Sequence, residues 1–348
     1  MINLNLSWIS KSIYFPDITH KGSWRRLQAE SCALRERGLS QGTWANKVSH
    51  LRTYITFTTY FNVPDFPVQL GVLLRFIPFL GRSPVGHSYV SSIVSSVKWF
   101  AGLLDPQSVE VFEAVIVKTS LKGLKAQLSR PVRQKLPFTL THLCKFYDFL
   151  NLCEPKHLSC WCAMLIAFFG CFRLSNLVPI SKGKFDALKQ LKRDDIKFKK
   201  DYVLIFYKWS KTNQNASRVA WVPIGSVSDP RFNIKCHFQK LFELVKVPSD
   251  APLFSFKNDL YHSRYSLVNL LDKCLYGAGL SIPDYSWHSF RRGAAVFAFE
   301  LGLADSAVQL LGDWSSDAFK NNLEFSFVRK AAIAKKIARN FDLQVTQL

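Results

Sequence analysis

The chain has 348 residues, and its 46 Lys and Arg residues against 25 Asp and Glu residues give a formal net charge of +21. Hydrophobic residues make up 48% of the sequence, which excludes an intrinsically disordered chain because so much apolar material can bury a core. The positive charge runs along the whole sequence and indicates a polyanionic partner, nucleic acid above all. The alternative is a basic protein whose charge serves only its solubility.

The apolar pattern argues against a membrane protein and a secreted protein. The longest apolar run, 161–172, is shorter than the roughly 20 residues that a membrane-spanning helix needs. The start of the sequence has no basic region followed by a long apolar one, so no signal peptide is expected. We therefore expect an intracellular protein, nuclear if its source is eukaryotic, with no membrane partner.

The eight cysteines form no CxxC pair, and Cys160 and Cys162 stand too close together for a zinc knuckle. Most lie in apolar surroundings, where a reduced thiol behaves as a small hydrophobic side chain. We expect reduced core residues, with metal ligation as the alternative.

The first part of the chain predicts an N-terminal extension over residues 1–39, followed by a compact helical domain over 40–128. The extension contains a basic helix over 24–37, which ends before Gly38. Pro78 is expected to distort the end of the second domain helix. Four helical segments form the domain, at 43–61, 68–80, 85–104 and 108–128.

Residues 129–137 predict a basic linker, because two prolines and three cations stand close together there. The alternative is an ordinary surface loop. The linker and the end of the helix before it contain the cations that we expect to contact DNA phosphates: Lys122, Lys125, Arg130, Arg133 and Lys135.

The second half, residues 138–348, predicts a mostly helical domain with one small antiparallel sheet. A helix over 139–152 precedes an almost wholly apolar segment, 158–172, which indicates a helix buried on all sides. Later helices are expected at 235–244, at 266–275 and from Trp287 onward. Three strands, which carry a basic hairpin tip at 211–216, are expected at 192–196, 203–209 and 218–222.

The sharpest local feature is the pair His288 and Arg291, which share one face at the start of a predicted helix. Ser286 is the expected N-cap of this helix, and Gly302 its C-terminal stop. Backbone donors, an imidazole and a guanidinium at one helix N-terminus suit a phosphate. Two residues in this spacing also occur often by chance.

Two further cations stand at positions where they could meet a phosphate. Arg173 follows the buried helix and needs a carboxylate or a phosphate as partner; a structural ion pair is the alternative. Lys211 stands at the hairpin tip, from which a long side chain can reach a neighbouring site; an ordinary surface lysine is the alternative.

The order of these features resembles the tyrosine recombinase (phage integrase) family. Arg173, Lys211 and the His288–Arg291 pair are followed by Leu-Gly-Asp-Trp-Ser-Ser at 311–316. The sequences at 172–179 and 310–318 are most similar to eukaryotic mobile-element recombinases of the DIRS and Ngaro type. The resemblance covers roughly residues 137–340, and the helical domain before it is consistent with the family's core-binding domain.

This resemblance implies a C-shaped clamp around duplex DNA, in which a tyrosine cuts one strand through a 3′-phosphotyrosyl link and the strand is then rejoined. Arg173 and Arg291 would hold the non-bridging oxygens of the phosphate, and His288 would add a hydrogen bond and proton transfer. Lys211 would protonate the leaving oxygen. The resemblance also implies that no metal, no cofactor and no small-molecule substrate is needed. Arg292, next to Arg291, is expected to contact DNA as well.

Two positions depart from the family pattern. Asp313 stands where the family has His or Trp, and Asn322 stands where the family has its tyrosine. An amide is not a nucleophile, and no tyrosine follows Tyr285 in the sequence. We therefore expect a DNA-binding protein of the recombinase type that is impaired in cleavage.

Three alternatives stay open at this stage. The chain could be an active recombinase that uses another group or a tyrosine of another subunit. It could also be an unrelated basic helical protein that binds DNA or RNA, or a purely structural protein. The sequence leaves open the DNA target and whether the protein acts as a homo-oligomer on DNA.

Overall fold

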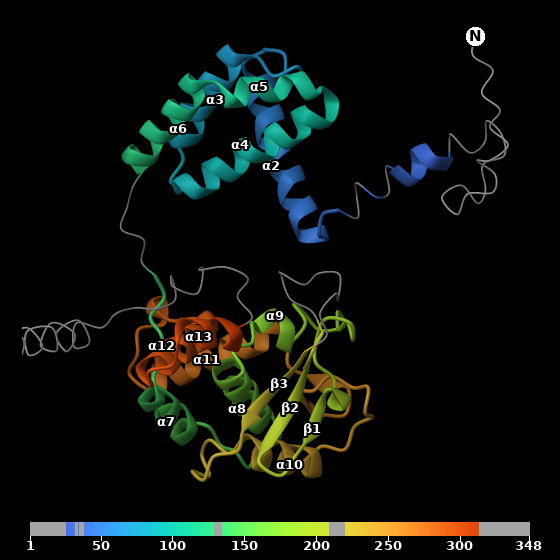
Figure 1. Cartoon of the computed structure of the whole chain (residues 1–348), viewed down its shortest axis with the longest axis vertical. Helices are drawn as coiled ribbons and strands as arrows, with labels where there is room; N and C mark the ends of the chain where they lie inside the picture. The colour runs from blue at the N-terminus through green and yellow to red at the C-terminus, as the bar shows by residue number, and fades with distance from the viewer. Residues whose placement is uncertain (1–25, 32–33, 35–37, 129–133, 209–219, 313–348) are drawn as a thin grey trace, which may run out of the picture. The chain divides into compact units, whose positions relative to one another are not determined.

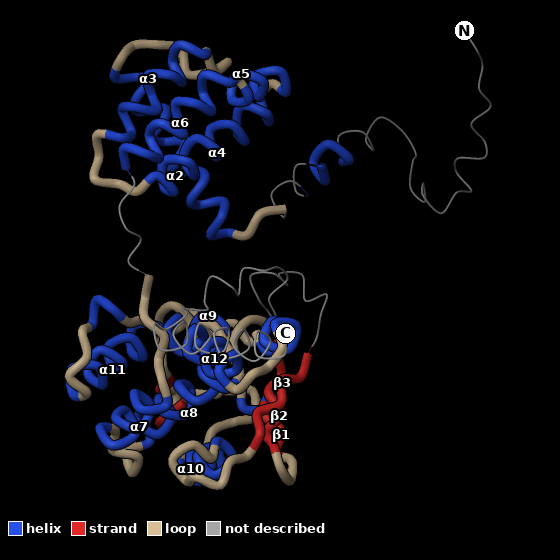
Figure 2. Tube along the Cα trace, turned by 60° about the vertical axis from the view of Figure 1, so that its left-hand side comes forward, coloured by secondary structure: helices blue, strands red, loops and turns tan. Residues whose placement is uncertain are grey.

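The computed structural model describes residues 26–31, 34, 38–128, 134–208 and 220–312, and divides into two compact units, Met1–Val132 and Arg133–Leu348 (Figure 1). Helices make up most of the described chain, and the second unit also contains a small antiparallel sheet (Figure 2). The predicted fold class, mostly α with a small antiparallel sheet, is therefore confirmed.

The first unit packs α2 (Gln41–Tyr60), α3 (Leu70–Gly81), α4 (His87–Leu104) and α6 (Val115–Leu128) around its own apolar core. The side chain of Ser40 accepts the Thr43 N–H and so caps α2. Contacts between Trp44 and Trp99 and between His50 and Tyr89 show that α2 and α4 run antiparallel. The aromatic centre of this core is formed by Tyr54, Phe57 and Phe76.

One prediction for this unit needs correction. The helix expected at 108–128 is three pieces: η2 (Pro106–Val109), α5 (Glu110–Glu113) and α6. Phe112 and Val117 are both buried, and in one continuous helix residues five apart would lie about 140° apart around the axis. The break at Ala114, whose ψ is 136°, brings both to the core. Pro78 lies inside α3, which continues to Gly81.

The second unit is built around α8 (Pro155–Phe169), in which every residue from Leu158 to Phe168 is buried, as the sequence predicts. Helices α10 (Ile234–Leu244) and α12 (His288–Glu300) pack against α8. The other helices of this unit are α7 (Leu140–Phe149), α9 (Leu174–Leu177), α11 (Arg264–Gly277) and α13 (Asp305–Leu311).

The sheet has the order β1-β2-β3 and is antiparallel throughout, with Ile205 of β2 opposite both Ile196 and Val222. Its strands are β1 (Ile196–Phe198), β2 (Tyr202–Tyr207) and β3 (Ala220–Gly225). The strand expected at 192–196 is wrong: residues 193–195 form a 3₁₀ turn, because the Asp195 carboxylate accepts the Lys192 N–H at 2.8 Å. The hairpin tip at 211–216 lies outside the described residues.

A second hairpin, β4 (Ser255–Lys257) with β5 (Leu260–Tyr261), was not predicted. Its turn places Asp259 in the left-handed region at φ 58°. The sequence did not predict this hairpin because strands of three and two residues are too short to show an alternating pattern.

Four of the cysteines that the structure describes are buried, as expected of core residues, whereas Cys153 and Cys236 are exposed. Burial raises the pKa of the Cys171 thiol to about 12. Within the described part of the chain, no helix is both long enough and apolar enough to cross a membrane.

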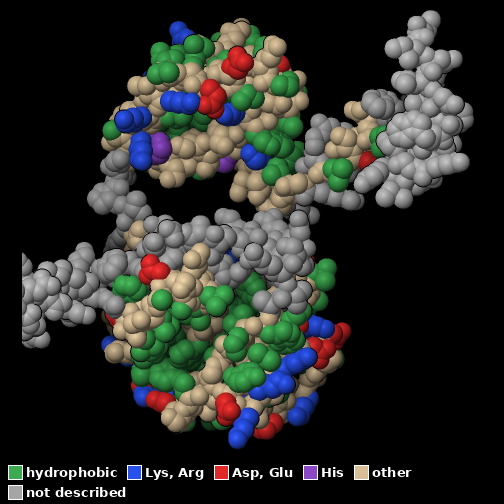
Figure 3. All heavy atoms as spheres, in the orientation of Figure 1, with side chains coloured by type: hydrophobic (Ala, Val, Ile, Leu, Met, Phe, Trp, Pro, Cys, Tyr) green, Lys and Arg blue, Asp and Glu red, His purple; other side chains and the backbone are tan. Residues whose placement is uncertain are grey.

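The surface of the second unit carries lysines on the side of its sheet. Lys197, Lys199 and Lys200 are exposed on β1 and on the turn after it. Figure 3 shows Lys and Arg side chains gathered on this side of the unit, with Asp and Glu side chains among them. A mixed surface of this kind is ordinary for a folded protein, so it does not by itself mark a binding site.

Candidate functional site

A pocket of about 340 Å³ in the second unit brings together three of the predicted site residues: Arg173, His288 and Arg291. They come from the turn after α8 and from the first turn of α12, more than a hundred residues apart in the chain. Side chains of α11 and of the segment before α12 complete the lining. The pocket is therefore made by long-range packing and not by one local motif.

The backbone turn after α8 places Arg173 in this pocket. Gly170 ends the helix, and a Cβ there would lie 2.8 Å from the Phe172 ring, so the position suits only glycine. Cys171 follows in the left-handed region at φ 53°, a conformation that is uncommon for a residue with a side chain. Its buried side chain packs among Ala294, Ala298 and their neighbours, which holds this turn against α12 and α13.

Arg173 is half-buried, and its Nη1 atom is buried without a hydrogen-bond partner among the residues that the structure describes. No described carboxylate lies within ion-pair distance of it, so the structural ion pair considered from sequence is not found there. A buried N–H without a partner is unfavourable by a few kcal/mol or less, and an anion in the pocket would supply the missing acceptor.

Arg291 is buried more deeply than expected, with only 2% of its surface exposed. Its Nη1 donates to the Cys171 carbonyl, and its Nη2 donates to the Gly312 carbonyl. The guanidinium thus ties the turn before Arg173 to the end of α13. Each terminal nitrogen of Arg291 thus gives one N–H to a backbone carbonyl. The expectation that both guanidiniums hold one phosphate stays a prediction.

His288 is exposed and is the first residue of α12. The N-cap of this helix is Trp287, and no side chain makes a capping hydrogen bond there, so the prediction that Ser286 caps the helix is wrong. The Ser289 side chain instead accepts the Ser286 N–H at 3.0 Å, which bends the chain as it enters the helix.

Lys211, Asp313 and Asn322, and also Arg130 and Arg133, lie outside the described residues. The described foot of the hairpin that carries Lys211 is held by an ion pair between Lys208 and Asp195, which are 12% and 4% exposed. Lys208 also donates to the Ala187 carbonyl at 2.8 Å.

The predicted DNA contacts that the structure describes fall into two groups. Lys122 and Lys125 are exposed on α6, so both could meet a phosphate. Arg292 is 3% exposed and donates to the Lys135 carbonyl, so the expectation of a surface contact with DNA is wrong for this side chain. Lys135 is half-buried and donates to the Pro283 carbonyl at 2.6 Å.

The polar residues that line the pocket include Arg264, Asp272 and Tyr285, which sequence reasoning missed. Arg264 begins α11, directly after Ser263, whose side chain caps that helix. A cap followed by an arginine was a readable signal. Asp272 and Tyr285 had none, because only the packing of α11 beside the segment before α12 brings them to the pocket.

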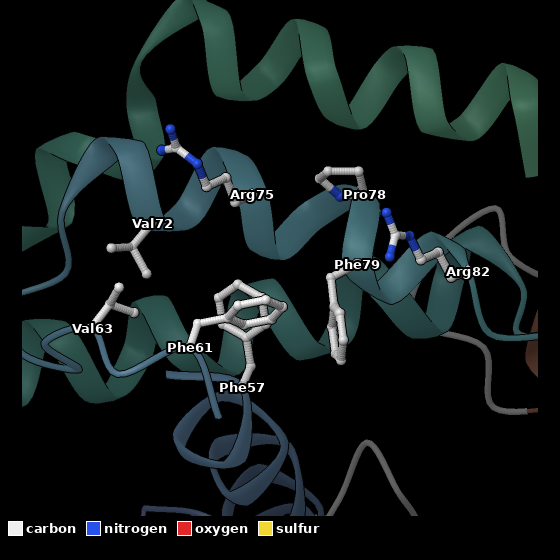
Figure 4. A pocket seen from close by; sticks show the side chains of 8 residues that line it. All are labelled: Phe57, Phe61, Val63, Val72, Arg75, Pro78, Phe79 and Arg82. Carbon is white, nitrogen blue, oxygen red and sulfur yellow. The ribbon is translucent and has the colours of Figure 1, made fainter. Parts of the chain in front are cut away.

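A larger pocket, of about 490 Å³, lies in the first unit between the end of α2 and α3 (Figure 4). Its walls are aromatic and aliphatic, and its charged residues are Arg75 on α3 and Arg82 at the C-cap of that helix. It has neither an acid nor a nucleophile among its lining residues, so it is not a candidate catalytic site. No cluster of His, Cys, Asp or Glu that could hold a metal ion occurs within the described ranges.

The sequence matches no protein-family model and no curated protein. Among solved structures, it is similar to the Tn1549 transposon integrase in complex with transposon right end DNA, with a TM-score of 0.62 and 15% identity over 88% of this chain and 98% of that chain. The same integrase in complex with circular intermediate DNA gives a TM-score of 0.60 and 14% identity over 88% of this chain and 98% of that chain. This chain has the tyrosine recombinase fold.

The tyrosine recombinase fold was the prediction from the order of Arg173, Lys211 and the His288–Arg291 pair, and it is confirmed. The particular likeness to DIRS-type elements stays a prediction. A lambda integrase dimer bound to a core site is a more distant match, with a TM-score of 0.49 and 16% identity over 87% of this chain and 95% of that chain.

Proposed function

We propose that the protein binds duplex DNA through its tyrosine recombinase fold and holds one backbone phosphate in the pocket of Arg173, His288 and Arg291. One observation carries the proposal: the buried Nη1 of Arg173 has no partner among the described residues and lies in a pocket that three more basic side chains, Arg264, His288 and Arg291, also line. A phosphate oxygen is the acceptor that such a donor lacks. The net charge of +21 favours the same partner.

Each pocket residue has a distinct part in phosphate binding. Arg173 donates to a phosphate oxygen, and His288, exposed at the start of α12, donates a second hydrogen bond. Arg291 contributes its buried positive charge while its terminal nitrogens hold the pocket wall to the Cys171 and Gly312 carbonyls. Lys211 would approach from the hairpin.

We further propose that the protein binds DNA without cutting it efficiently. Cleavage needs a hydroxyl that attacks phosphorus while the 5′-oxygen leaves with a proton. Asn322 has no such hydroxyl. The pocket donors come from other segments, so phosphate binding does not depend on residue 322.

A second candidate is an active recombinase that uses Tyr285, because this tyrosine lines the same pocket. Its environment argues against the role. Burial, followed by the neighbouring Asp284 charge, raises the pKa of the Tyr285 phenol, and its ring is stacked on Phe138 with centroids 4.9 Å apart. A phenol that ionises less readily and is held in a stack is a poor nucleophile.

Fluorescence anisotropy with a labelled duplex tests the binding proposal. A protein that makes six to ten phosphate contacts should lose on the order of 10³–10⁵ in affinity between 50 and 200 mM salt. Arg173→Ala should weaken binding about ten- to a hundredfold, since hydrogen bonds to charged groups contribute roughly 1.5–3 kcal/mol. Lys240→Ala, an exposed cation on α10 that does not line the pocket, is the control. A flat salt dependence, or equal affinity of both variants, contradicts the proposal.

A suicide duplex, which traps a covalent protein–DNA adduct, tests the cleavage proposal. The wild-type protein should give no adduct, and Asn322→Tyr should give at least a trace that disappears when Arg291→Ala is added. An adduct from the wild type would disprove the inactive assignment. Its loss in Tyr285→Phe would then identify Tyr285 as the nucleophile.

We also propose that the protein associates with itself on DNA. The corner between α12 and α13 exposes Leu301 and Leu303 beside Glu300 and Asp305, and the sequence has no Lys or Arg between Arg292 and Lys320. The sequence at 328–339 is basic and carries apolar residues at helical spacing, so it is complementary to this corner of a neighbouring copy. Sedimentation of the DNA complex should show more than one copy, and Leu301→Asp should reduce the number.

A further inference from the structure

Residues 134–138, called the strap here, follow directly on the segment that joins the two units in sequence. The strap lies along residues 283–287, which lead into α12, and along the first turn of that helix (Figure 1). The Leu136 N–H donates to the Asp284 carbonyl at 2.8 Å, and the Phe138 N–H donates to the Ser289 carbonyl at 3.0 Å. The Lys135 ammonium donates to the Pro283 carbonyl at 2.6 Å. This part of the expected linker is therefore fixed to the second unit.

Helix α12 contacts the strap through two successive residues that are placed next to Arg291. Arg292 is buried, and its Nη1 donates to the Lys135 carbonyl. A Cβ on Gly293 would lie 2.1 Å from the Phe138 carbonyl oxygen, so only glycine allows this approach of helix and strap. The helix and the strap backbone are thus in direct contact through two buried residues of α12.

The Phe138 ring links the strap to both sides of the pocket. It is stacked on the Tyr285 ring, with centroids 4.9 Å apart and planes 4° apart, and it packs against Phe290 at 4.6 Å. Tyr285 lines the pocket, and Phe290 stands between His288 and Arg291 in the first turn of α12. A displacement of Phe138 would move the groups on either side of it.

We propose that the strap positions His288 and Arg291, so that Lys135, Phe138 and Arg292 are positioning residues of the phosphate pocket. The first turn of α12 has no side-chain cap, and the strap contacts supply the fixation that a cap would otherwise give. The inference rests on the proposed function for the meaning of the pocket. It adds that residues 134–138, at the start of the second unit, set the geometry of phosphate binding.

A double-mutant cycle on DNA affinity in the full chain tests the inference. Phe138→Leu should weaken binding of a labelled duplex about fivefold, the scale of coupling between residues in contact. In an Arg173→Ala background the same change should have less than about a twofold effect, because the pocket is already impaired. The matched control is Phe254→Leu, which truncates another ring that is 1% exposed but does not line the pocket.

The control separates positioning from stability. Both leucine variants should lower the thermal midpoint, but only Phe138→Leu should change affinity at a temperature where the protein is folded. Equal affinity of the two variants overturns the inference. If Phe138→Leu does not fold, Lys135→Ala, at a half-buried position, takes its place in the cycle. It should likewise weaken DNA binding more in the wild-type background than in the Arg173→Ala background.

A DNA-free measurement distinguishes failure of the inference from failure of the proposed function. The imidazole signals of His288 in an NMR spectrum of histidine-labelled protein should shift in Phe138→Leu and stay in place in Phe254→Leu. If they shift while Arg173→Ala binds DNA normally, the phosphate proposal is wrong and the strap stands. If they do not shift, the strap inference is wrong.

Discussion

At the scale of single residues, Arg173 and Arg291 show that two guanidiniums in one pocket can differ in role, one available to a ligand and one hydrogen-bonded to the backbone. The two terminal nitrogens of Arg291 donate to two backbone carbonyls. The buried Nη1 of Arg173, in contrast, has no hydrogen-bond partner among the described residues. The first arrangement stabilises the fold, and the second is costly until an anion arrives.

This difference predicts that Arg173 limits the stability of the free protein. Arg173→Met removes the unpaired donor and should raise the free energy of unfolding without DNA by about 1 kcal/mol. Urea denaturation measures that change, and the same variant should bind DNA more weakly. A variant that is less stable than the wild type would show that the guanidinium has a favourable partner in the free protein.

His262 predicts the dependence of stability on pH in the acid range. It is fully buried; its Nε2 donates to the Lys156 carbonyl at 3.0 Å, so its Nδ1 accepts from the Ser266 hydroxyl at 2.7 Å. Burial lowers its pKa from 6.5 to about 4. The unfolded chain therefore takes up the proton first, and stability present above pH 6.5 is lost as the pH falls toward 4, by up to roughly 3 kcal/mol.

Urea denaturation at several pH values measures this effect. Between pH 6.5 and 4 the stability of His262→Gln should fall less steeply than that of the wild type, because glutamine does not titrate. Parallel curves would show that the histidine keeps its ordinary pKa in the folded protein.

At the scale of elements, single hydrogen bonds and ion pairs set the ends of strands and helices. The Asp195 carboxylate accepts the Lys192 N–H and pairs with Lys208 at the end of β2, which turns an expected strand into a 3₁₀ turn. At the C-terminal end of α12, Gly302 stops the helix as predicted. Its φ is 83°, and its N–H donates to the Phe299 carbonyl.

The Lys208–Asp195 pair predicts a strong dependence of the sheet on one carboxylate. Asp195→Asn leaves a largely buried ammonium without its charge partner and should destabilise the protein by about 3 kcal/mol. The double variant Asp195→Asn with Lys208→Met removes both charges and should recover part of that loss. Chemical denaturation of the three proteins measures both steps, and a neutral Asp195→Asn would contradict the assigned role.

At the scale of the whole molecule, each unit has an apolar core of its own, one around Phe76 and one around α8. Two cores that share no residue can lose their structure independently.

We therefore expect two transitions when the protein unfolds. Phe76→Ala should lower the midpoint of one and Phe254→Ala the midpoint of the other, each by the equivalent of about 3–5 kcal/mol. Differential scanning calorimetry resolves the two. A single transition that both variants shift equally would show that the units unfold as one.

The sequence by itself determined the features that depend on composition and local spacing. The positive charge, the helix buried on all sides, the glycine stop at Gly302 and the order of the basic motifs were all readable, because charge is additive and helical periodicity spans few residues. The order of motifs led to the tyrosine recombinase fold, and Asn322 is a property of the sequence alone.

Only the tertiary structure decided which of these cations are available to a ligand. Nothing local distinguishes Arg291 and Arg292 from Arg173, yet carbonyls of Cys171, Gly312 and Lys135 engage the first two. Those carbonyls lie at the ends of other elements, and no periodic pattern records which of them a side chain will meet. A guanidinium becomes a site or a structural tie according to the acceptors that packing brings to it.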